Sequence, residues 1–182
     1  MLYIKKKSLE TSKKEIDFIG GMEIDMKKIV VTAWTVILCL SMMGCGSRAV
    51  ENSAGTCTIM VECSTILNNM DKLDASVKEF VPEDGMILKE KEVDFSEGDS
   101  VYDVLNRELK KEKIMMEASF TGSSAYVEGI DNIYEFSCGE LSGWEYSVNG
   151  EFPGKSCSDY KVENDDVIEW HYTCDLGEDL KN

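Results

Sequence analysis

The chain has 182 residues, a formal net charge of −16 at pH 7 and a sequence pI of about 4.4. An acidic surface of this size repels phosphate groups, so nucleic acid and anionic lipid headgroups are disfavoured as partners, whereas neutral or cationic ligands are favoured. The alternative is a solvated acidic face that has no partner. The length allows one main domain once any targeting segment is removed.

The first segment with a clear pattern lies some distance inside the chain. A basic pair at 27–28 precedes an uncharged run from Ile29 to Met43, and Gly44-Cys45-Gly46-Ser47 follows. This order is typical of a secretory signal peptide, and the apolar run is shorter than the roughly 17–25 residues of a spanning helix. We therefore expect residues 26–44 to be a leader, with translation beginning at Met26 and residues 1–25 a spurious or disordered extension.

Gly44-Cys45 resembles the lipobox of bacterial lipoproteins. The resemblance implies that Cys45 is lipidated, becomes the mature N-terminus and anchors an extracytoplasmic domain to the cell membrane; several acyl chains make such an anchor stable. The alternative is a small buried cysteine near a helix end. Residues 45–56 are short and polar, and we expect them to link the anchor to the domain.

The sequence pattern in the first half of the domain predicts two strands and one long helix. Residues 57–63 alternate apolar and polar, which indicates a half-buried strand, and residues 86–95 form another. Residues 64–73 predict a short helix or turn. The helix begins after Ser100, which can cap it together with Asp103, and its apolar stripe is Val101, Val104, Leu105 and Leu109.

The second half predicts short strands over 114–120, 125–130, 133–136 and 167–174, together with a hairpin from Trp144. Asn149-Gly150 suits a two-residue hairpin turn, because both turn positions need a positive φ. Trp144 and Tyr146 then share one face of the strand. Two interpretations stay open for these rings, an exposed platform on which a flat ligand stacks and a core position against the helix stripe. For Trp170 and Tyr172 the core position is favoured.

Strands on either side of a single central helix predict an α+β domain, with the helix packed on one face of a mixed sheet. A β-grasp-like arrangement fits, with the first and last strands adjacent at the centre of the sheet.

Five cysteines lie beyond the leader and Cys45, and in an exported domain they are disulfide candidates rather than zinc ligands. Cys57 and Cys63 share one strand about 20 Å apart, too far for a bridge. An odd number leaves one thiol over. We expect Cys138–Cys157 across the base of the hairpin and Cys63–Cys174 at one end of the two central strands.

Several motifs together resemble an uncharacterised bacterial domain family related to the C-terminal domain of transcobalamin and intrinsic factor. They are DSVYDVL (99–105), the GWEYSVNG hairpin (143–150), Pro153, Tyr160 and DVIEW (166–170) with Tyr172. The resemblance covers residues 57–177, leaves 178–182 as a tail, and implies a β-grasp-like fold in an exported lipoprotein. In the animal proteins this domain covers one face of cobalamin, which makes a corrinoid (cobalamin or cobinamide) the candidate ligand here. The candidate ligand-binding residues are Trp144, Tyr146, Asn149 and Tyr160.

Catalysis has no support from motifs, since the sequence lacks a nucleophile elbow, HExxH and a phosphate loop. His171 is the single histidine, and we expect it to be solvent-exposed and inert. The Asp165-Asp166 and Asp71/Asp74 pairs lack the spacing of a calcium loop and are interpreted as turn acids, so no metal site is expected.

Two functions therefore remain. The first is a lipid-anchored binding module that captures a corrinoid or another small planar or hydrophobic molecule for an uptake transporter. The second is a structural or adhesive cell-surface module whose aromatic residues are internal and which has no small-molecule ligand.

Overall fold

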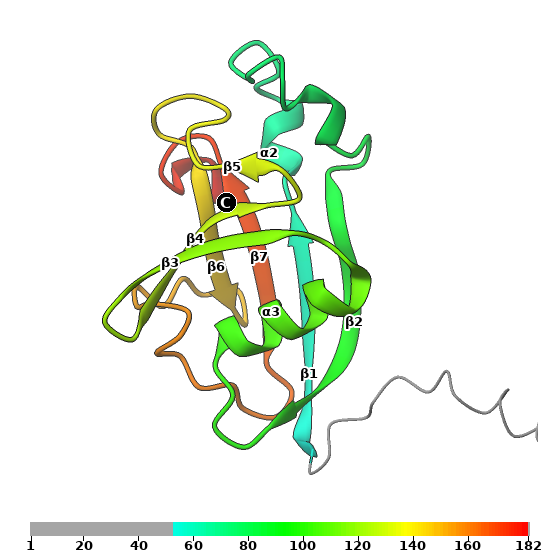
Figure 1. Cartoon of the computed structure of the whole chain (residues 1–182), viewed down its shortest axis with the longest axis vertical. Helices are drawn as coiled ribbons and strands as arrows, with labels where there is room; N and C mark the ends of the chain where they lie inside the picture. Colours follow the sequence, from blue (N-terminus) through cyan, green and yellow to red (C-terminus); the bar gives the residue numbers. More distant parts are fainter. Residues whose placement is uncertain (1–52, 182) are drawn as a thin grey trace, which may run out of the picture. The chain divides into compact units, whose positions relative to one another are not determined.

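The computed structural model describes residues 53–181 (Figure 1). The predicted extension (1–25), the leader (26–44) and Cys45 lie outside these residues. The described chain is α+β, with two sheets and one long helix. Its elements, in order, are β1 (Ser53–Glu62), α2 (Ser64–Leu67), η1 (Lys78–Phe80), β2 (Met86–Ser96), α3 (Val101–Glu112), β3 (Met116–Thr121), β4 (Ser124–Ile130), β5 (Ile133–Tyr134), β6 (Gly143–Val148), β7 (Val167–Thr173) and η2 (Glu178–Leu180).

The larger sheet has the strand order β2-β1-β7-β6. β1 and β7 are parallel neighbours, while β2 and β6 pair antiparallel with them at the two edges. The predicted mixed sheet, with the first and last strands adjacent at its centre, is thus confirmed. The strands β3, β4 and β5 form a separate antiparallel sheet, which the sequence did not distinguish from the first.

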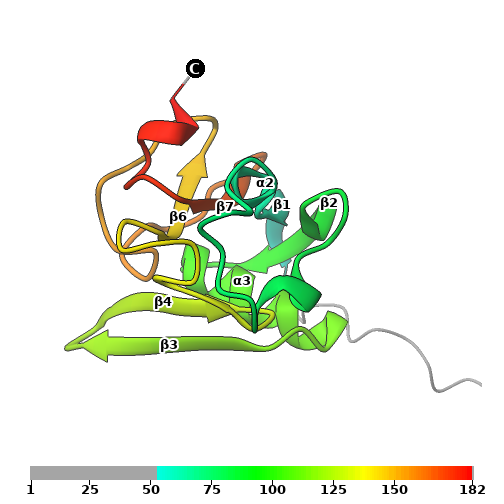
Figure 2. The ribbon, with the colours of Figure 1, turned by 90° about the horizontal axis from the view of Figure 1, so that it is seen from above.

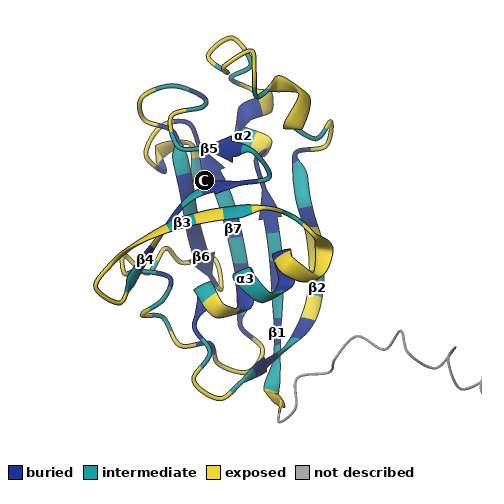
Figure 3. Ribbon diagram, in the orientation of Figure 1, coloured by how far each residue is buried: buried dark blue, intermediate teal, exposed yellow. Residues whose placement is uncertain are grey.

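The core lies on one side of the larger sheet. The second sheet crosses that side, and α3 lies on the same side (Figures 1 and 2). Alternation along each strand sends apolar side chains inward, as in β1, where Cys57, Ile59 and Val61 are buried. Figure 3 shows buried positions along the strands of the larger sheet and mostly exposed positions along β3.

The helix α3 begins as predicted. Ser100 and Asp103 form a capping box, and the helix ends at Glu112, followed by the cap residue Lys113 with a left-handed φ of 62°. The predicted apolar stripe is buried, but Glu108 is buried within it at 1 % exposure. Lys91 of β2 and Lys111 reach the Glu108 carboxylate at 3.1 and 2.6 Å, which compensates for the loss of its hydration.

Both predicted ends of the domain need correction. β1 begins at Ser53, inside the segment predicted as a linker, and pairs there with Ser96. The predicted tail also contributes to the fold, because Asp179 of η2 accepts hydrogen bonds from the Thr173 hydroxyl and, at 2.8 Å, from the backbone N–H of Cys174. None of the helices between residues 53 and 181 is long and apolar enough to cross a membrane.

The Asn149-Gly150 turn forms as predicted, with φ values of 55° and 78°. Glu151 bridges back to Val148, but the chain then leaves the sheet, and β6 pairs with β7 instead of a returning hairpin strand. The predicted hairpin is therefore reduced to a tight turn followed by a loop.

The predicted disulfides Cys138–Cys157 and Cys63–Cys174 are absent, because all five cysteines of the described chain are buried free thiols. The pairing of β1 with β7 explains the second error. Glu62 is level with His171, so Cys63 comes level with Tyr172 and Cys174 lies two residues further on. The first error follows from the missing return strand, since Cys157 lies instead beside the carbonyl oxygen of Ala125.

Candidate functional site

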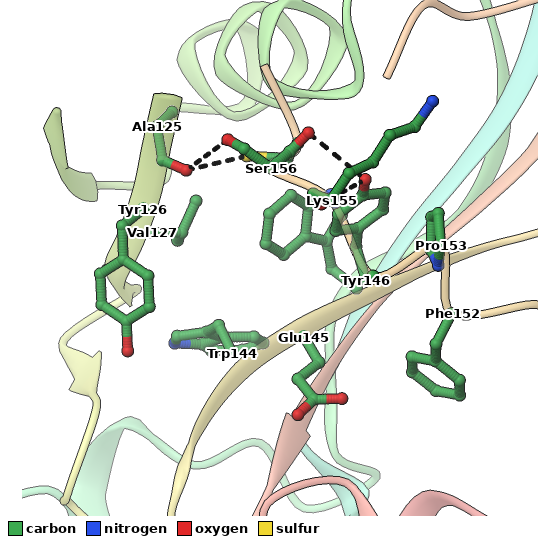
Figure 4. Close-up of a pocket in the computed structure, with 13 residues that line it drawn as sticks. Ala125, Tyr126, Val127, Trp144, Glu145, Tyr146, Phe152, Pro153, Lys155 and Ser156 are labelled. Atoms are coloured by element: carbon green, nitrogen blue, oxygen red, sulfur yellow. Dashed lines mark hydrogen bonds between the residues drawn. The ribbon is translucent and has the colours of Figure 1, made fainter. Parts of the chain in front are cut away.

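A cavity of about 400 Å³ lies beside the free edge of β6, where it faces β4 of the second sheet (Figure 4). The loop that follows the Asn149-Gly150 turn closes one side of it. Aromatic side chains from four segments, which are β4, β6, the loop after the turn and β7, contribute to its walls. The lining residues are Ala125, Tyr126, Val127, Trp144, Glu145, Tyr146, Phe152, Pro153, Gly154, Lys155, Ser156, Cys157 and Trp170.

Two of the four predicted ligand-binding residues, Trp144 and Tyr146, line this cavity. They are 7 % and 9 % exposed, so they are not the exposed platform that was one of the two interpretations. The indole N–H of Trp144 donates to the carbonyl of Ile133 at 2.9 Å, and the Tyr146 hydroxyl donates to the carbonyl of Lys155 at 2.9 Å. Because both polar groups are already satisfied, these side chains offer the cavity mainly apolar ring surface.

The predicted core position of Trp170 is confirmed by its 2 % exposure, but the side chain also lines the cavity. Its ring lies 5.5 Å from that of Tyr146, centroid to centroid. The buried Nε1 of Trp170 has no hydrogen-bond partner within residues 53–181. Alternation along β7 placed this ring on the inner face, but nothing in the sequence showed that the second sheet leaves space beside it.

The rim of the cavity is formed by two exposed aromatic residues that sequence reasoning missed. Tyr126 is 50 % exposed and Phe152 is 42 % exposed. The Tyr126 hydroxyl donates to Glu135 at 2.7 Å; burial, followed by this hydrogen bond, raises the pKa of Tyr126 to about 12. The apolar Phe152-Pro153 pair directly after a turn was the one available signal, because an apolar pair in a loop needs a partner.

The other two predicted binding residues lie outside the cavity lining. Asn149 fixes the turn: its side-chain amide donates to Asp166 at 2.9 Å, and its side-chain oxygen accepts from the N–H of Val167 at 2.9 Å. Tyr160 packs edge-on against Tyr146, with the Lys155 ammonium 4.3 Å from the centre of its ring. Asn149 is thus a turn residue, and Tyr160 supports a lining residue from behind.

The opposite face of the same strands carries a hydrogen-bonded network that corrects the prediction for His171. Its side chain is 15 % exposed instead of solvated. His171 Nδ1 lies 2.7 Å from the Glu62 carboxylate, and His171 Nε2 lies 3.3 Å from the Ser147 hydroxyl. The order Ser–His–Glu matches that of a hydrolase triad.

This network has the connections of a triad without room for a substrate. Ser147 is 1 % exposed, and its hydroxyl also donates to Glu169 at 3.1 Å. A nucleophile must reach the substrate carbonyl, and a carboxylate acceptor holds this hydroxyl proton away from the imidazole. The geometry therefore favours a structural role for the network.

Two of the acidic residues singled out in the sequence, Asp166 and Asp74, serve turns. Asp166 is 6 % exposed and accepts from Asn149 and from the N–H of Glu163 at 2.9 Å. Asp74 accepts from the N–H and the hydroxyl of Ser76, both at 2.8 Å. Between residues 53 and 181, no group of three or more His, Cys, Asp or Glu side chains is arranged to hold a metal ion.

The comparison with protein families gives one match. A family model described as a domain of unknown function, DUF4430, matches residues 98–174. The matched segment is less than half of the chain, and it includes α3, both strands that carry the buried cavity rings, and the loop that closes the cavity. A search of curated proteins finds no significant match.

Two solved structures are similar at low identity. Haptocorrin in complex with Cbi is 13 % identical with a TM-score of 0.49; the alignment covers 72 % of this chain and 28 % of that chain. A candidate metal-binding protein from Ruminococcus gnavus ATCC 29149 is 13 % identical with a TM-score of 0.39, covering 65 % of this chain and 96 % of that chain. The chain thus spans under a third of the haptocorrin length, and scores this low carry no inference about function.

Proposed function

We propose that residues 53–181 form a non-enzymatic binding module that captures a small planar or hydrophobic molecule in the cavity beside β6. The observation that carries this proposal is the gathering of Trp144, Tyr146 and Trp170 with the exposed rings of Tyr126 and Phe152 around one open space. Ligand sites of this kind combine apolar and aromatic walls with a few polar groups.

A corrinoid is the ligand we propose to test first, on the basis of the sequence motifs that resemble the transcobalamin-related family. The cavity volume lies at the lower end of the range for ligand sites, roughly 300–1,000 Å³. It therefore suits contact with one face or edge of a corrin ring rather than its enclosure. Lys155 and Glu145 at the cavity supply the charged groups that would orient the polar side chains of the ring.

The exposed rim residues allow a test that does not disturb the core. Cobinamide and cobalamin are titrated by equilibrium dialysis, with binding read from corrinoid absorbance, against the wild type and the variants Tyr126→Ala and Phe152→Ala. Loss of an aromatic contact is expected to weaken binding up to about tenfold. Phe120→Ala is the matched control, since Phe120 is 55 % exposed and lies outside the cavity lining.

The outcomes separate the ligand from the site. Saturable binding that falls in both rim variants and is unchanged in Phe120→Ala supports a corrinoid in the cavity. Binding that is equal in all four proteins places the ligand elsewhere and contradicts the proposed site. No binding of either corrinoid overturns the corrinoid assignment; a planar apolar dye tested with the same variants then decides whether the cavity binds any ligand of this class.

We further propose that the module is exported and anchored to the membrane through a lipid on Cys45, where it would pass its ligand to an uptake transporter. The leader-like segment at 26–44 and the Gly44-Cys45 pair support this placement. Metabolic labelling with a fatty-acid analogue tests it: the wild type is labelled and Cys45→Ala is not. A wild type that takes up no label would contradict the anchor.

A structural or adhesive surface module is the second candidate function, and the deep burial of Trp144 and Tyr146 favours it. In this function the aromatic residues serve only the fold. The module would then act by self-association or by binding a protein partner. Sedimentation of the purified chain at increasing concentration tests self-association. A monomer throughout, combined with corrinoid binding, would leave the binding module as the better explanation.

A further inference from the structure

Two of the five free thiols meet at the end of the larger sheet. Cys138 lies in the segment between β5 and β6 and is fully buried, while Cys174 directly follows β7 and is 6 % exposed. The Cys138 thiol is near enough to raise the pKa of the Cys174 thiol. The two residues come from segments 36 positions apart, so the contact is made by the fold and not by sequence proximity.

Each thiol also contacts α2 or the turn that follows it. Cys138 Sγ lies 3.5 Å from the carbonyl oxygen of Asn69, and Cys174 Sγ lies 3.8 Å from the hydroxyl of Thr65. Asn69 and Thr65 are themselves joined, because the Asn69 side-chain amide donates to the Thr65 carbonyl at 2.9 Å. Both thiols therefore pack against one turn of the chain.

A hydrogen-bonded link also fixes Cys138 relative to β7. The Tyr172 hydroxyl donates to the carbonyl of Tyr134 at 2.7 Å and lies 2.9 Å from the Ser142 hydroxyl oxygen. That oxygen accepts from the backbone N–H of Cys138 at 3.0 Å. Because Tyr172 precedes Cys174 by two residues on the same strand face, this link holds both cysteines in one arrangement.

We propose that Cys138 and Cys174 form a disulfide when the chain folds in the presence of a disulfide oxidant, either a small-molecule disulfide or a thiol–disulfide oxidoreductase. The two thiols lose two electrons and two protons, the Cys138 Sγ–Cys174 Sγ bond forms, and the oxidant's S–S bond breaks to give two thiols. This inference does not depend on the proposed ligand. It joins the segment between β5 and β6 to the end of β7.

The other three cysteines between residues 53 and 181 are expected to stay as thiols. Burial raises the pKa of Cys57 to about 11, that of Cys63 to about 12 and that of Cys157 to about 11. Thiolates are the reactive form, so these side chains react slowly once the protein has folded. Cys57 and Cys63 are also separated along β1 by their strand spacing.

The oxidation is expected to occur during folding. Burial, followed by the neighbouring Cys138 thiol, raises the pKa of Cys174 to about 12, so the folded pair presents little thiolate to an external oxidant. The full chain is therefore reduced and unfolded, then refolded with a mixture of reduced and oxidised glutathione. Free thiols are blocked with N-ethylmaleimide, and the protein is digested with trypsin without reduction.

The sequence makes the peptide map decisive, because tryptic cleavage at Lys113, Lys155, Lys161 and Lys181 separates Cys138, Cys157 and Cys174 into different peptides. The expected result is a linked pair of peptides 114–155 and 162–181, with peptide 156–161 carrying the maleimide label. A link from peptide 156–161 to either of the others, or maleimide label on both Cys138 and Cys174 in the refolded protein, would overturn the proposal.

Thermal unfolding supplies a second readout that does not rely on peptide recovery. Oxidised wild type is expected to unfold at a temperature on the order of 10 °C above the reduced form. Cys138→Ser and Cys174→Ser should abolish this difference between redox states, and Cys157→Ser, the matched control, should keep it. A redox-dependent shift that persists in Cys138→Ser would assign the bond to another pair; if that variant does not fold, the wild-type peptide map still decides.

Discussion

The two faces of β6 and β7 differ in chemistry although they belong to the same strands. One face carries Trp144, Tyr146 and Trp170, whose rings leave a cavity between the two sheets. The other carries Ser147 and His171, which are closed into a network with Glu62 and Glu169. On the first face most polar groups are hydrogen-bonded and a cavity lies beside the rings. On the second face the polar groups form a complete hydrogen-bonded network, and the serine is buried.

This difference shows that residue chemistry alone does not identify a site. The network has the residue types and connections of a hydrolase triad, yet its serine is buried. The aromatic rings look like core residues by exposure, yet they border a cavity open at a rim of exposed rings. Access from solvent distinguishes the aromatic face from the network face. Four perturbations test this difference.

The largest effect is expected from Trp170→Ala, which removes a ring that is 2 % exposed. Loss of packing and the cavity left behind should lower the free energy of unfolding by about 3–5 kcal/mol, measured by urea denaturation. Phe152→Ala at the cavity rim is the matched control and should cost less than about 1 kcal/mol. Equal losses for the two variants would mean that the rim is part of the core.

On the opposite face, His171→Ala removes one of the hydrogen bonds of the Glu62 carboxylate, which is 7 % exposed, and leaves the bond from the backbone N–H of Ser64. We expect a loss of about 1–3 kcal/mol in the free energy of unfolding. The double variant Glu62→Leu with His171→Leu should recover part of this loss, because it removes the buried charge as well. A single variant with wild-type stability would show that the network adds nothing.

The pH dependence of stability should follow two buried carboxylates. Burial raises the pKa of Glu62, but hydrogen bonds from His171 and Ser64 outweigh it and leave the pKa below the ordinary 4.5. Glu108 behaves in the same way, with burial opposed by Lys111 and Lys91. A carboxyl whose pKa is lower in the folded state contributes stability above its unfolded pKa and loses it as pH falls through the folded pKa.

The urea concentration at the unfolding midpoint, measured between about pH 6 and pH 3, should therefore stay constant near pH 6. It should decrease once the pH is lower than 4.5. Glu62→Gln and Glu108→Gln should each flatten this fall, since the substituted side chain does not titrate. A fall of the same steepness in both variants would assign the acid sensitivity to other carboxyl groups.

The smallest effect is expected from Asn149→Gly, which keeps the positive φ of 55° accessible but removes the side-chain bonds to Asp166 and Val167. We expect a cost of about 1 kcal/mol in stability and unchanged corrinoid binding. Weaker binding at unchanged stability would return Asn149 to the ligand site and contradict its role in the turn.

Local signals predicted the elements well, because their causes are local. The capping box at Ser100 and Asp103, the Asn149-Gly150 turn and the alternation along β7 all depend on neighbours within a few residues. The adjacency of the first and last strands at the centre of the larger sheet was also predicted, from the β-grasp-like arrangement, but the full strand order was not. The same alternation correctly put Trp144 and Tyr146 on one face of their strand, but it left open whether that face was buried.

The features that escaped prediction depend on how distant segments meet. Glu108 was buried because Lys91 of another element reaches it, and His171 was buried because the register of β1 with β7 places Glu62 beside it. The cavity arises between two sheets whose separation no sequence pattern records. The Cys63–Cys174 pair was wrong because a shift of two residues along parallel strands changes which thiols can meet, and the Cys138–Cys157 pair was wrong because the chain leaves the sheet after the turn.

The parallel pairing of β1 with β7 also has a mechanical consequence. β1 is entered at Ser53 and β7 is left at Thr173, at opposite ends of two adjacent central strands. Tension applied to the two ends of the domain slides these strands along each other, so the whole row of bonds from Thr58 to Glu62 must break together. A chain pulled this way resists extension far better than one whose terminal strands peel apart bond by bond.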